Sequence, residues 1–599
     1  MARFCFSSRY QYLFKNYCNV LGGTSFRSHT QLSENLYKER ATFHKTIYCE
    51  KYYSSTSGLS DGNIFKSHIS EIPDSNGLLL HEYLWQNAGK WWDKTALECA
   101  ETGRSYTYGQ LKRLSGRLAT SLRKNNLQPG DTIAAILPNV PEYAIIFLGA
   151  SEAGLKLTVV NPLYTVREIK RQLVISDSKA VITMPFKYST VTESISDNKS
   201  IKLPIIMIED GTGPVPSGTI NFKDLISDNV EEFEKTGQKT EQNPNEDAFL
   251  LPCSSGTTGL PKCIELTQRN LIMNCLQLKA EHDFLFPLTS KTHQEIVPLF
   301  LPLFHIYGIS SIMNTYLSIG AKLIFMPQFS SSKLLQVLET NEATALMLVP
   351  PIIQLLINNE NFTPRHMRNI RLVSSGAAPT SQTMVEELIK QSRKLFFYGL
   401  GYGLSETSPL ISFSVKAPNE SSGLIRPNTQ LRIVGCNDED KNKNLGINEV
   451  GEIFVKGPQV MKGYYKNLQA TQECMEGEWF KTGDLGLIDD QGFLYIKGRL
   501  KELIKVQGYQ VAPAELEDVI LGHEKVADVA VIGVPHERYG EIPKAFIVPK
   551  PNMRIDEQEL KEFVAKRVAK YKHLGHITIT DTIPKSPAGK ILRRELQKI

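Results

Sequence analysis

The stretch that decides the fold is Ser254-Ser255-Gly256-Thr257-Thr258-Gly259-Leu260-Pro261-Lys262. Its small residues let backbone N–H groups approach an anion closely, its hydroxyls donate further hydrogen bonds, and Lys262 supplies a positive charge. The spacing of the glycines and the lysine differs from that of a Walker loop, and no Ser or Thr follows the lysine. The stretch therefore predicts a phosphate-binding loop of another kind. The alternative is a Ser/Thr/Gly hairpin or linker without a ligand.

The size and composition of the chain indicate a large globular protein. At 599 residues it has room for about three domain-sized units, or one large domain and a smaller one. Hydrophobic residues make up 41% and charged residues 22%, a balance that excludes a wholly disordered or fibrous chain. No uninterrupted apolar run reaches the length of about 18 residues that a spanning helix needs. We therefore predict no transmembrane segment.

The charge and the cysteines exclude two further classes. Residues 1–50 carry a net charge of +4, which leaves only +1 for the other 549 residues. A nearly neutral body without a basic run argues against nucleic acid as a partner. The nine cysteines are scattered and form no CxxC pair. This spacing predicts reduced thiols inside a cell, with neither a disulfide framework nor a zinc site.

The N-terminal 50 residues have the composition of a mitochondrial transit peptide. The first acidic residue is Glu34, and four basic residues and several serines precede it. We predict a mitochondrial location, and the alternative is a disordered extension on a cytoplasmic or peroxisomal protein. The C-terminal Gln597-Lys598-Ile599 is not the usual peroxisomal tripeptide.

Local patterns predict an α/β fold with a small α+β unit near the C-terminus. Residues 133–137 and 157–160 are strand patterns on either side of a predicted helix at 141–153, which makes a βαβ unit and a parallel sheet. Over the last 100 residues, Pro513 marks the start of a helix, and Asp556 with Glu559 fits a capping box. The polar residues 231–247 are interpreted as a surface linker.

The nine-residue stretch resembles the signature of the adenylate-forming superfamily, and further motifs of that superfamily follow along the chain. This superfamily includes acyl-CoA synthetases, 4-coumarate–CoA ligases and firefly-type luciferases, and the 4-coumarate–CoA ligase-like branch is the most similar. The other family-like motifs follow in order: Pro302-Leu303-Phe304-His305-Ile306-Tyr307-Gly308, residues 375–379, Gly401-Tyr402-Gly403-Leu404-Ser405-Glu406, Thr482-Gly483-Asp484, residues 498–505 and residues 584–590.

The resemblance implies an α/β fold with two domains. The large N-terminal adenylate-forming domain would contain parallel sheets with helices and a small β-barrel, and would span residues 51–498. A hinge at residues 499–502 would join it to a small mobile α+β domain at residues 503–599. Residues 1–50 would be the transit peptide or disordered extension.

The resemblance also implies a two-step reaction. A carboxylate attacks the α-phosphate of ATP to give an acyl-adenylate, and the thiol of coenzyme A then displaces AMP. Mg²⁺ would accompany ATP. The protein contributes mainly positioning and charge neutralisation. Ile306, Tyr307, Phe304 and Leu400 favour an aromatic or medium-chain apolar acid over acetate.

Site residues carry over from the family motif by motif. Those expected to bind the nucleotide are Ser254, Ser255, Gly256, Thr257, Thr258, Gly259, Lys262, Gly401, Tyr402, Gly403, Ser405, Asp484 and Arg499. Glu406 would bind Mg²⁺. Lys590 would stabilise the adenylation transition state, and His305 would lie in the acyl pocket. After rotation of the small domain about Lys501, the residues expected near the adenylate or coenzyme A are Lys505, Gln510 and Gly508.

Four positions depart from the family pattern. Cys263 stands where the family usually has glycine, Leu400 replaces a glutamine, Ser405 replaces a threonine and Gln507 replaces a lysine. None removes a central charge, so we predict an active enzyme that ligates an acid to coenzyme A. The alternatives are a luciferase-like monooxygenase, a stand-alone adenylation domain and a catalytically dead nucleotide-binding protein.

Overall fold

The computed structural model describes residues 59–60 and 63–599, apart from 210, 212–214, 255–260, 281–283, 379, 381, 395, 416–417, 419–420, 437–439, 507–508, 537 and 587–588. The predicted transit peptide lies outside the described residues. Residues 58–599 form one unit. None of the helices in this described part combines the length and apolarity needed to cross a bilayer.

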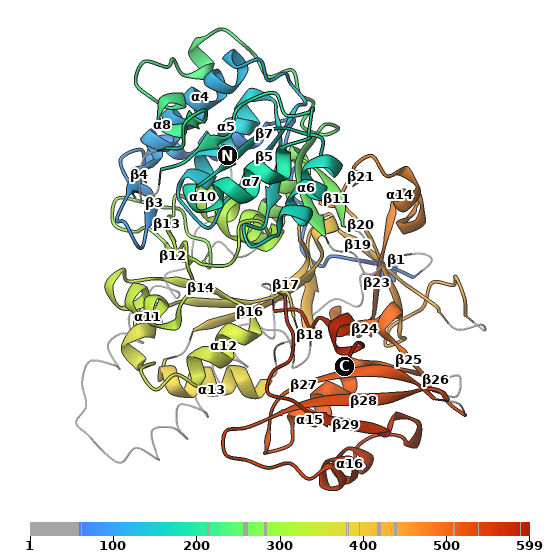
Figure 1. The fold of residues 1–599 in the computed structure, drawn as a ribbon. Helices are drawn as coiled ribbons and strands as arrows, with labels where there is room; N and C mark the ends of the chain where they lie inside the picture. The colour runs from blue at the N-terminus through green and yellow to red at the C-terminus, as the bar shows by residue number, and fades with distance from the viewer. Residues whose placement is uncertain are drawn as a thin grey trace, which may run out of the picture. The chain divides into compact units, whose positions relative to one another are not determined.

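An eight-stranded sheet contains the predicted βαβ unit. Its strands lie in the order β21 (Gly463–Tyr464), β11 (Lys262–Thr267), β10 (Ala248–Ser254), β6 (Lys156–Val160), β5 (Thr132–Ile136), β7 (Ser178–Thr183), β8 (Ile206–Met207) and β9 (Ile220–Asn221). Strands β5 and β6 pair in parallel, and α5 (Glu142–Ala153) connects them. Figure 1 shows α5 beside α4 (Tyr108–Lys124) on this sheet. The α/β prediction is confirmed.

The longest sheet carries the strands that surround the candidate site. Its order is β1 (Leu59–Ser60), β2 (Ile64–Lys66), β19 (Gln430–Val434), β20 (Gly451–Lys456), β23 (Trp479–Ile488), β24 (Phe493–Arg499), β18 (Ser421–Ile425), β17 (Leu410–Ser414), β16 (Phe397–Gly403), β15 (Leu372–Ser375) and β14 (Ala345–Leu348), with β22 (Met475–Glu476) paired to β23. The antiparallel strands expected as a small barrel are continuous with this sheet. A third sheet has the order β12 (Ile296–Leu299), β13 (Lys322–Phe325), β3 (Thr95–Cys99) and β4 (Ser105–Thr107).

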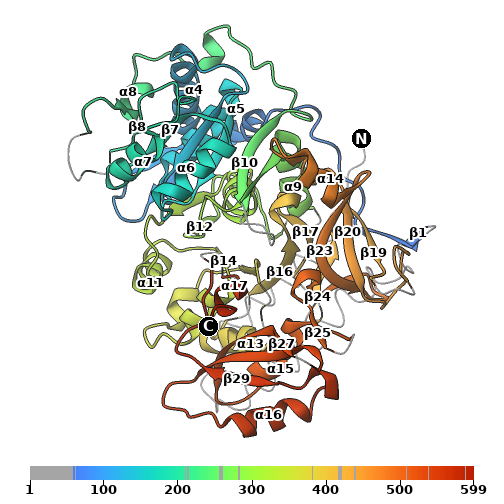
Figure 2. The same ribbon diagram turned by 45° about the vertical axis from the view of Figure 1, so that its right-hand side comes forward.

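The C-terminal unit has its own sheet and its own core. The sheet order is β26 (Tyr509–Val511), β25 (Ile504–Val506), β28 (Gly540–Pro549) and β27 (Val526–His536), with β29 (His576–Ile579) beside β28. Helices α15 (Pro513–Leu521) and α16 (Glu557–Ala565) accompany it in Figure 2. Asp556 caps α16 by accepting a hydrogen bond from the Glu559 N–H, but the Glu559 carboxylate accepts from Lys525 instead, so only half of the predicted capping box is formed. The buried residues Ile504, Leu516 and Val564 belong to a separate hydrophobic cluster.

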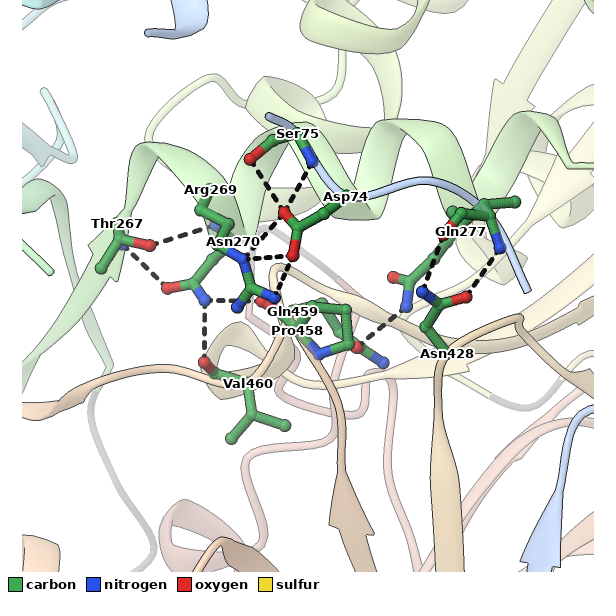
Figure 3. Close-up of polar contacts among 11 residues, drawn as sticks. Asp74, Ser75, Thr267, Arg269, Asn270, Gln277, Asn428, Pro458, Gln459 and Val460 are labelled. Atoms are coloured by element: carbon green, nitrogen blue, oxygen red, sulfur yellow. Dashed lines mark hydrogen bonds and ion pairs between the residues drawn. The ribbon is translucent and has the colours of Figure 1, made fainter. Parts of the chain in front are cut away.

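A polar network at the start of α9 (Gln268–Lys279) fastens distant segments to one another (Figure 3). Arg269 donates to both carboxylate oxygens of Asp74, at 3.0 Å and 2.6 Å. The Asn270 amide donates to the Pro458 and Val460 carbonyl oxygens at 2.7 Å and 3.0 Å. Buried donors and acceptors are costly to leave unpaired, so these bonds fix the path of the loop that follows β20.

The predicted surface linker at residues 231–247 is packed in part. Phe233 is only 5% exposed, and the Thr240 hydroxyl donates to the Glu152 carbonyl oxygen at the end of α5. The Gln242 amide donates to the Gly154 carbonyl oxygen over 2.8 Å. The linker interpretation is therefore wrong for these positions. The mostly polar composition gave no sign that one aromatic residue would be buried or that two side chains would donate hydrogen bonds to backbone carbonyl oxygens.

The prediction that all cysteines are reduced thiols is also wrong. The sulfurs of Cys253 and Cys263 are bonded to each other across β10 and β11. Spacing along the chain did not indicate the pair, because the two residues are brought together by the register of antiparallel strands. The cysteines that remain free among the described residues are Cys99, Cys275, Cys436 and Cys474.

Candidate active site

A pocket of about 750 Å³ contains residues from both the acyl and the nucleotide motifs. This volume includes the solvent-filled opening of the pocket. Predicted residues in its wall include His305, Tyr307, Tyr402 and Ser405 from the large domain, and Lys590 from the C-terminal unit. Residues that are distant in sequence therefore share one cavity, as the motif assignments require.

The pocket also has an apolar wall that the sequence reasoning missed. The acyl and nucleotide motifs supply only part of the wall. The additional lining residues are Leu278, Phe286, Tyr316, Met347, Leu372, Ser374, Leu410 and Phe413. They come from α9, from the strands β14, β15 and β17, and from the segments between them. No motif marks them, because a buried pocket wall has the same apolar pattern as any core segment.

Two predicted pocket residues are not in the wall. Leu400 lies in β16 next to Gly401, and Phe304 precedes His305, but the pocket is lined by Gly401 and His305. Leu400 and Phe304 are both absent from the wall of this cavity, although their neighbours in sequence line it. The expectation that Leu400 makes the acyl site more apolar is therefore not met by this cavity.

Glycine at position 403 is required by the close approach of two chain segments. A Cβ placed on Gly403 would lie 1.7 Å from the Pro409 carbonyl oxygen. That oxygen accepts a hydrogen bond from the Leu404 N–H over 3.0 Å, which closes the connection between β16 and β17. Any side chain would force the two segments apart and would displace Ser405 and Glu406, which follow directly.

His305 is held as a neutral imidazole in the pocket. Its Nδ1 atom accepts a hydrogen bond from the Tyr307 backbone N–H over 3.3 Å, at the start of the π-helix Tyr307–Asn314. Burial lowers the pKa of His305 to about 4, and the Lys590 charge acts in the same direction. At neutral pH this residue is therefore a polar wall of the pocket, without a positive charge.

Lys590 enters the pocket from a turn of the C-terminal unit that contacts the large domain. The Ser586 N–H donates to the Lys590 carbonyl oxygen over 2.8 Å, which forms the turn. Gly589 has φ +81°, and a Cβ there would lie 3.1 Å from Pro351. A glycine at this position thus permits both the turn and the contact with α12 (Pro350–Ile357).

The amine of Lys590 lies in a mixed electrostatic environment. Desolvation by the surrounding protein lowers the pKa of Lys590, and the Arg499 charge lowers it further. The carboxylates of Asp484 and Glu406 oppose this change. The residue keeps solvent access through the open side of the pocket. The Lys590 amine, near two carboxylates and a guanidinium, can therefore serve as the cation that binds a phosphate group in this pocket.

Asp484 is the centre of the cluster predicted to bind the nucleotide. It is 4% exposed and faces Arg499 across the β23–β24 pair, with 2.9 Å between Arg499 Nε and Asp484 Oδ1. The Tyr402 hydroxyl donates to Asp484 Oδ2 over 2.7 Å. Burial and the neighbouring Asp484 charge raise the pKa of Tyr402, so its phenol stays protonated. The three residues form a rigid polar edge beside the pocket.

Glu406 lies in a short 3₁₀ turn, Ser405–Thr407, and its carboxylate is oriented by Tyr464. The Tyr464 hydroxyl donates to Glu406 Oε1 over 3.0 Å. The Lys262 amine lies 5.0 Å from the centre of the same tyrosine ring. The loop anchored by α9 supports the backbone here, because the Met461 N–H donates to the Glu406 carbonyl oxygen over 2.8 Å.

The phosphate stretch is described only at its two ends. Ser254 ends β10 and Lys262 begins β11, and their Cα atoms are cross-strand partners. Ser255, Gly256, Thr257, Thr258 and Gly259 lie outside the described residues.

Of the residues assigned to the second half-reaction, the described side chain, that of Lys505, is not brought into the pocket. Lys505 is exposed on β25, and its backbone N–H donates to Glu541 over 2.8 Å. Its Cα partner is Gln510 on β26, whose side chain lies outside the described part of the chain, as does Gly508. Lys505 does not line the cavity that contains Lys590.

The sheets, the pocket and the lysine from the smaller unit together define a two-domain α/β enzyme with a nucleotide-type site. Comparison with known proteins agrees. The model of the family "AMP-binding enzyme" matches residues 84–465, and that of the "AMP-binding enzyme C-terminal domain" matches residues 515–590. The chain therefore belongs to the AMP-binding enzymes, the adenylate-forming superfamily that includes the AMP-forming acid–CoA ligases.

Named relatives and solved structures are consistent with this membership. The chain is 36% identical to 4-coumarate–CoA ligase 1 of Arabidopsis thaliana, over 89% of this chain and 95% of that protein. It is 35% identical to 4-coumarate–CoA ligase 1 of Petroselinum crispum, over 89% and 96%. The structure of ATP-bound MatB from Rhodopseudomonas palustris superposes with a TM-score of 0.75 at 26% identity, over 87% of this chain and 98% of that one.

Proposed function

We propose that this protein is an ATP-dependent acid–CoA ligase. It joins an aromatic or medium-chain carboxylic acid to AMP and then transfers the acyl group to coenzyme A. The single observation that carries the proposal is that Lys590 lies in the same cavity as the acyl-motif residue His305 and the nucleotide-motif residue Tyr402. Acid and nucleotide must meet at one cation for adenylation to occur.

Each residue has a role that its surroundings support. The edge formed by Asp484, Tyr402 and Arg499 offers carboxylate acceptors for ribose hydroxyls and a cation for phosphate. The apolar wall, which includes Phe286, Met347 and Phe413, would hold the body of the acid. Lys590 would neutralise the charge that develops on the α-phosphate as the carboxylate attacks.

Glu406 fits the part of a magnesium ligand. Mg²⁺ prefers oxygen donors and usually binds through one or two carboxylates, phosphate oxygens and water. Among the described residues, no group of three or more His, Cys, Asp or Glu side chains could hold a metal by itself. Mg²⁺ would therefore arrive with the triphosphate, where it neutralises phosphate charge. Glu406 would hold it at the pocket edge.

The small domain would change its orientation between the two half-reactions. In the present arrangement Lys590 lines the pocket, whereas Lys505 does not. The 3₁₀ turn Leu500–Glu502 follows directly after Arg499 and precedes β25. Rotation at this turn would withdraw Lys590 and present the other face of the domain.

The experiment that tests the function is a pyrophosphate-release screen. Purified protein, Mg²⁺ and ATP are offered a panel of aromatic and medium-chain acids, with and without coenzyme A. We expect release with at least one such acid, and an acyl-CoA product only when coenzyme A is present. Release without acyl-CoA, accompanied by oxygen consumption or light, would instead favour a luciferase-like monooxygenase. No release with any acid would contradict the proposal.

We also propose that residues 1–50 direct the protein to mitochondria. Their basic, serine-containing composition supports this address. Fusion of residues 1–50 to a fluorescent protein tests it, and a diffuse cytosolic signal would count against it.

A further inference from the structure

The Cys253–Cys263 disulfide joins the two strand ends that flank the phosphate stretch. Cys253 is the next-to-last residue of β10, and Cys263 is the second residue of β11. The Cα atoms of the two cysteines are cross-strand partners 4.0 Å apart. The next pair along the ladder is Ser254 with Lys262. The bond therefore closes a covalent ring around residues 254–262, which include every residue of the phosphate stretch.

The two cysteines of the disulfide differ in exposure. Cys263 is 1% exposed, and its carbonyl oxygen accepts a hydrogen bond from the Tyr465 N–H, just after β21, over 2.8 Å. Cys253 is only partly buried. A thiolate attacks a disulfide along a path to one sulfur, and access decides which sulfur reacts. Exchange would therefore begin at Cys253.

We propose that Cys253 and Cys263 form a reversible thiol–disulfide modification site that sets the affinity of the chain for ATP. The part concerning ATP rests on the proposed function, whereas the chemistry of the site does not. A disulfide with one partly exposed cysteine can be opened and closed by exchange with other thiols. The position of this one, next to Lys262, assigns it to the nucleotide site.

Reduction proceeds by two exchanges with a dithiol. One thiolate of the dithiol attacks the Cys253 sulfur, the Cys253–Cys263 bond breaks, and its electron pair leaves on Cys263, which takes up a proton. In the mixed disulfide, the first sulfur of the dithiol is bonded to Cys253. The second thiolate of the dithiol attacks that first sulfur and releases Cys253, which takes up a proton to become a thiol. The dithiol becomes a cyclic disulfide. Oxidation is the reverse, with a low-molecular-weight disulfide as the oxidant.

The cross-link acts by fixing the ends of β10 and β11 relative to each other before ATP binds. While it is closed, Lys262 is held in register with Ser254 at the end of the ladder. When it is open, only backbone pairing holds this end, and ATP must fix the conformations that the bond had removed. Because a preordered site loses less entropy on binding, we expect reduction to weaken MgATP binding by about three- to tenfold.

Peptide mapping tests the site directly. Wild-type protein is equilibrated with glutathione disulfide or with dithiothreitol, alkylated under denaturing conditions and digested. We expect a linked Cys253–Cys263 peptide in the first sample and two alkylated cysteines in the second. Full alkylation of both cysteines after glutathione disulfide would overturn the proposal. This readout needs neither ATP nor an acid, so it is independent of the proposed function.

Titration calorimetry with MgATP tests the effect on affinity. Wild-type protein should bind more weakly after dithiothreitol, whereas Cys253→Ser should bind weakly in both conditions. Cys436→Ser, which removes a free cysteine outside the pocket, is the matched control and should respond like wild type. An equal response of Cys253→Ser and wild type to dithiothreitol would overturn the link to ATP. If MgATP binds in neither state, the proposed function is wrong. The peptide map still shows whether Cys253 and Cys263 form a reversible disulfide.

Discussion

The Tyr402 hydroxyl donates a hydrogen bond to Asp484 over 2.7 Å, and this bond joins two motifs that are 82 residues apart in sequence. Asp484 also pairs with Arg499, so its carboxylate holds a phenol and a guanidinium in fixed positions. The sequence assigned Tyr402 and Asp484 to the same nucleotide, and the structure shows that they are also partners of each other.

This relationship predicts the outcome of Asp484→Asn. The substitution removes the charge that Arg499 faces and weakens the acceptor of the Tyr402 bond. Hydrogen bonds to charged groups contribute about 1.5–3 kcal/mol, so we expect MgATP binding to weaken by about 10- to 100-fold. Titration calorimetry measures it. Asp490→Asn, in the exposed turn of the same hairpin, is the control and should bind MgATP normally. Unchanged binding in Asp484→Asn would remove Asp484 from the nucleotide site.

Substitution of Lys590 by alanine should abolish most of the adenylation activity. The amine lies in the pocket beside His305, and loss of one preorganised charge typically lowers a rate by about 10²–10³-fold. Acid-dependent pyrophosphate release measures the effect. The melting temperature should stay close to that of wild type, because the side chain keeps solvent access. Lys598→Ala, at the exposed C-terminal end, is the control. Full turnover of Lys590→Ala would refute its role.

Tyr464→Phe should weaken the response to magnesium more than nucleotide binding itself. The variant loses the hydroxyl that donates to Glu406 and keeps the ring that faces Lys262. A net hydrogen bond contributes about 0.5–1.5 kcal/mol, so we expect the Mg²⁺ concentration for half-maximal ATP binding to rise about three- to tenfold. Tyr465→Phe, whose hydroxyl instead contacts Lys156, is the matched control. Equal magnesium dependence in both variants would contradict the assignment.

The low pKa of His305 predicts a loss of stability in acid. The folded protein takes up this proton only near pH 4, whereas the unfolded chain takes it up near 6.5. Between these values the unfolded state binds more protons, so stability falls as pH falls from about 6.5 to about 4. The melting temperature of His305→Gln should therefore drop less between pH 7.5 and pH 5 than that of wild type. An identical drop would show that this imidazole is not held neutral.

The opposite dependence is expected for Glu152, which is 7% exposed within α5. Burial raises the pKa of Glu152 to about 8, although Ser115 donates a hydrogen bond to it over 2.6 Å. The folded state keeps a proton that the unfolded chain loses near 4.5, so stability falls as pH rises from about 4.5 to about 8.

Glu152→Gln tests this dependence, because glutamine is neutral at every pH and can still accept from Ser115. At pH 8.5 we expect the melting temperature of the variant to exceed that of wild type by about 1–3 °C, and the difference should disappear near pH 5. Glu193→Gln, at an exposed position, should not change the melting temperature at either pH. A variant less stable than wild type at pH 8.5 would contradict a protonated Glu152.

Sequence alone located those features whose physics is local. The βαβ unit, the Pro513 helix start and the Asp556 cap depend on residues within a few turns of one another, and all three are confirmed. The order of the family motifs likewise assigned residues to the nucleotide, and that assignment stays a prediction.

Only the tertiary structure decided which residues share the pocket. The apolar wall, the bond from Tyr464 to Glu406 and the Cys253–Cys263 disulfide all depend on contacts between chain segments. Pairing register and helix packing set such contacts, and neither composition nor local periodicity reports them. Leu400, which the sequence placed in the pocket, is likewise absent from its wall, and no local pattern reports this.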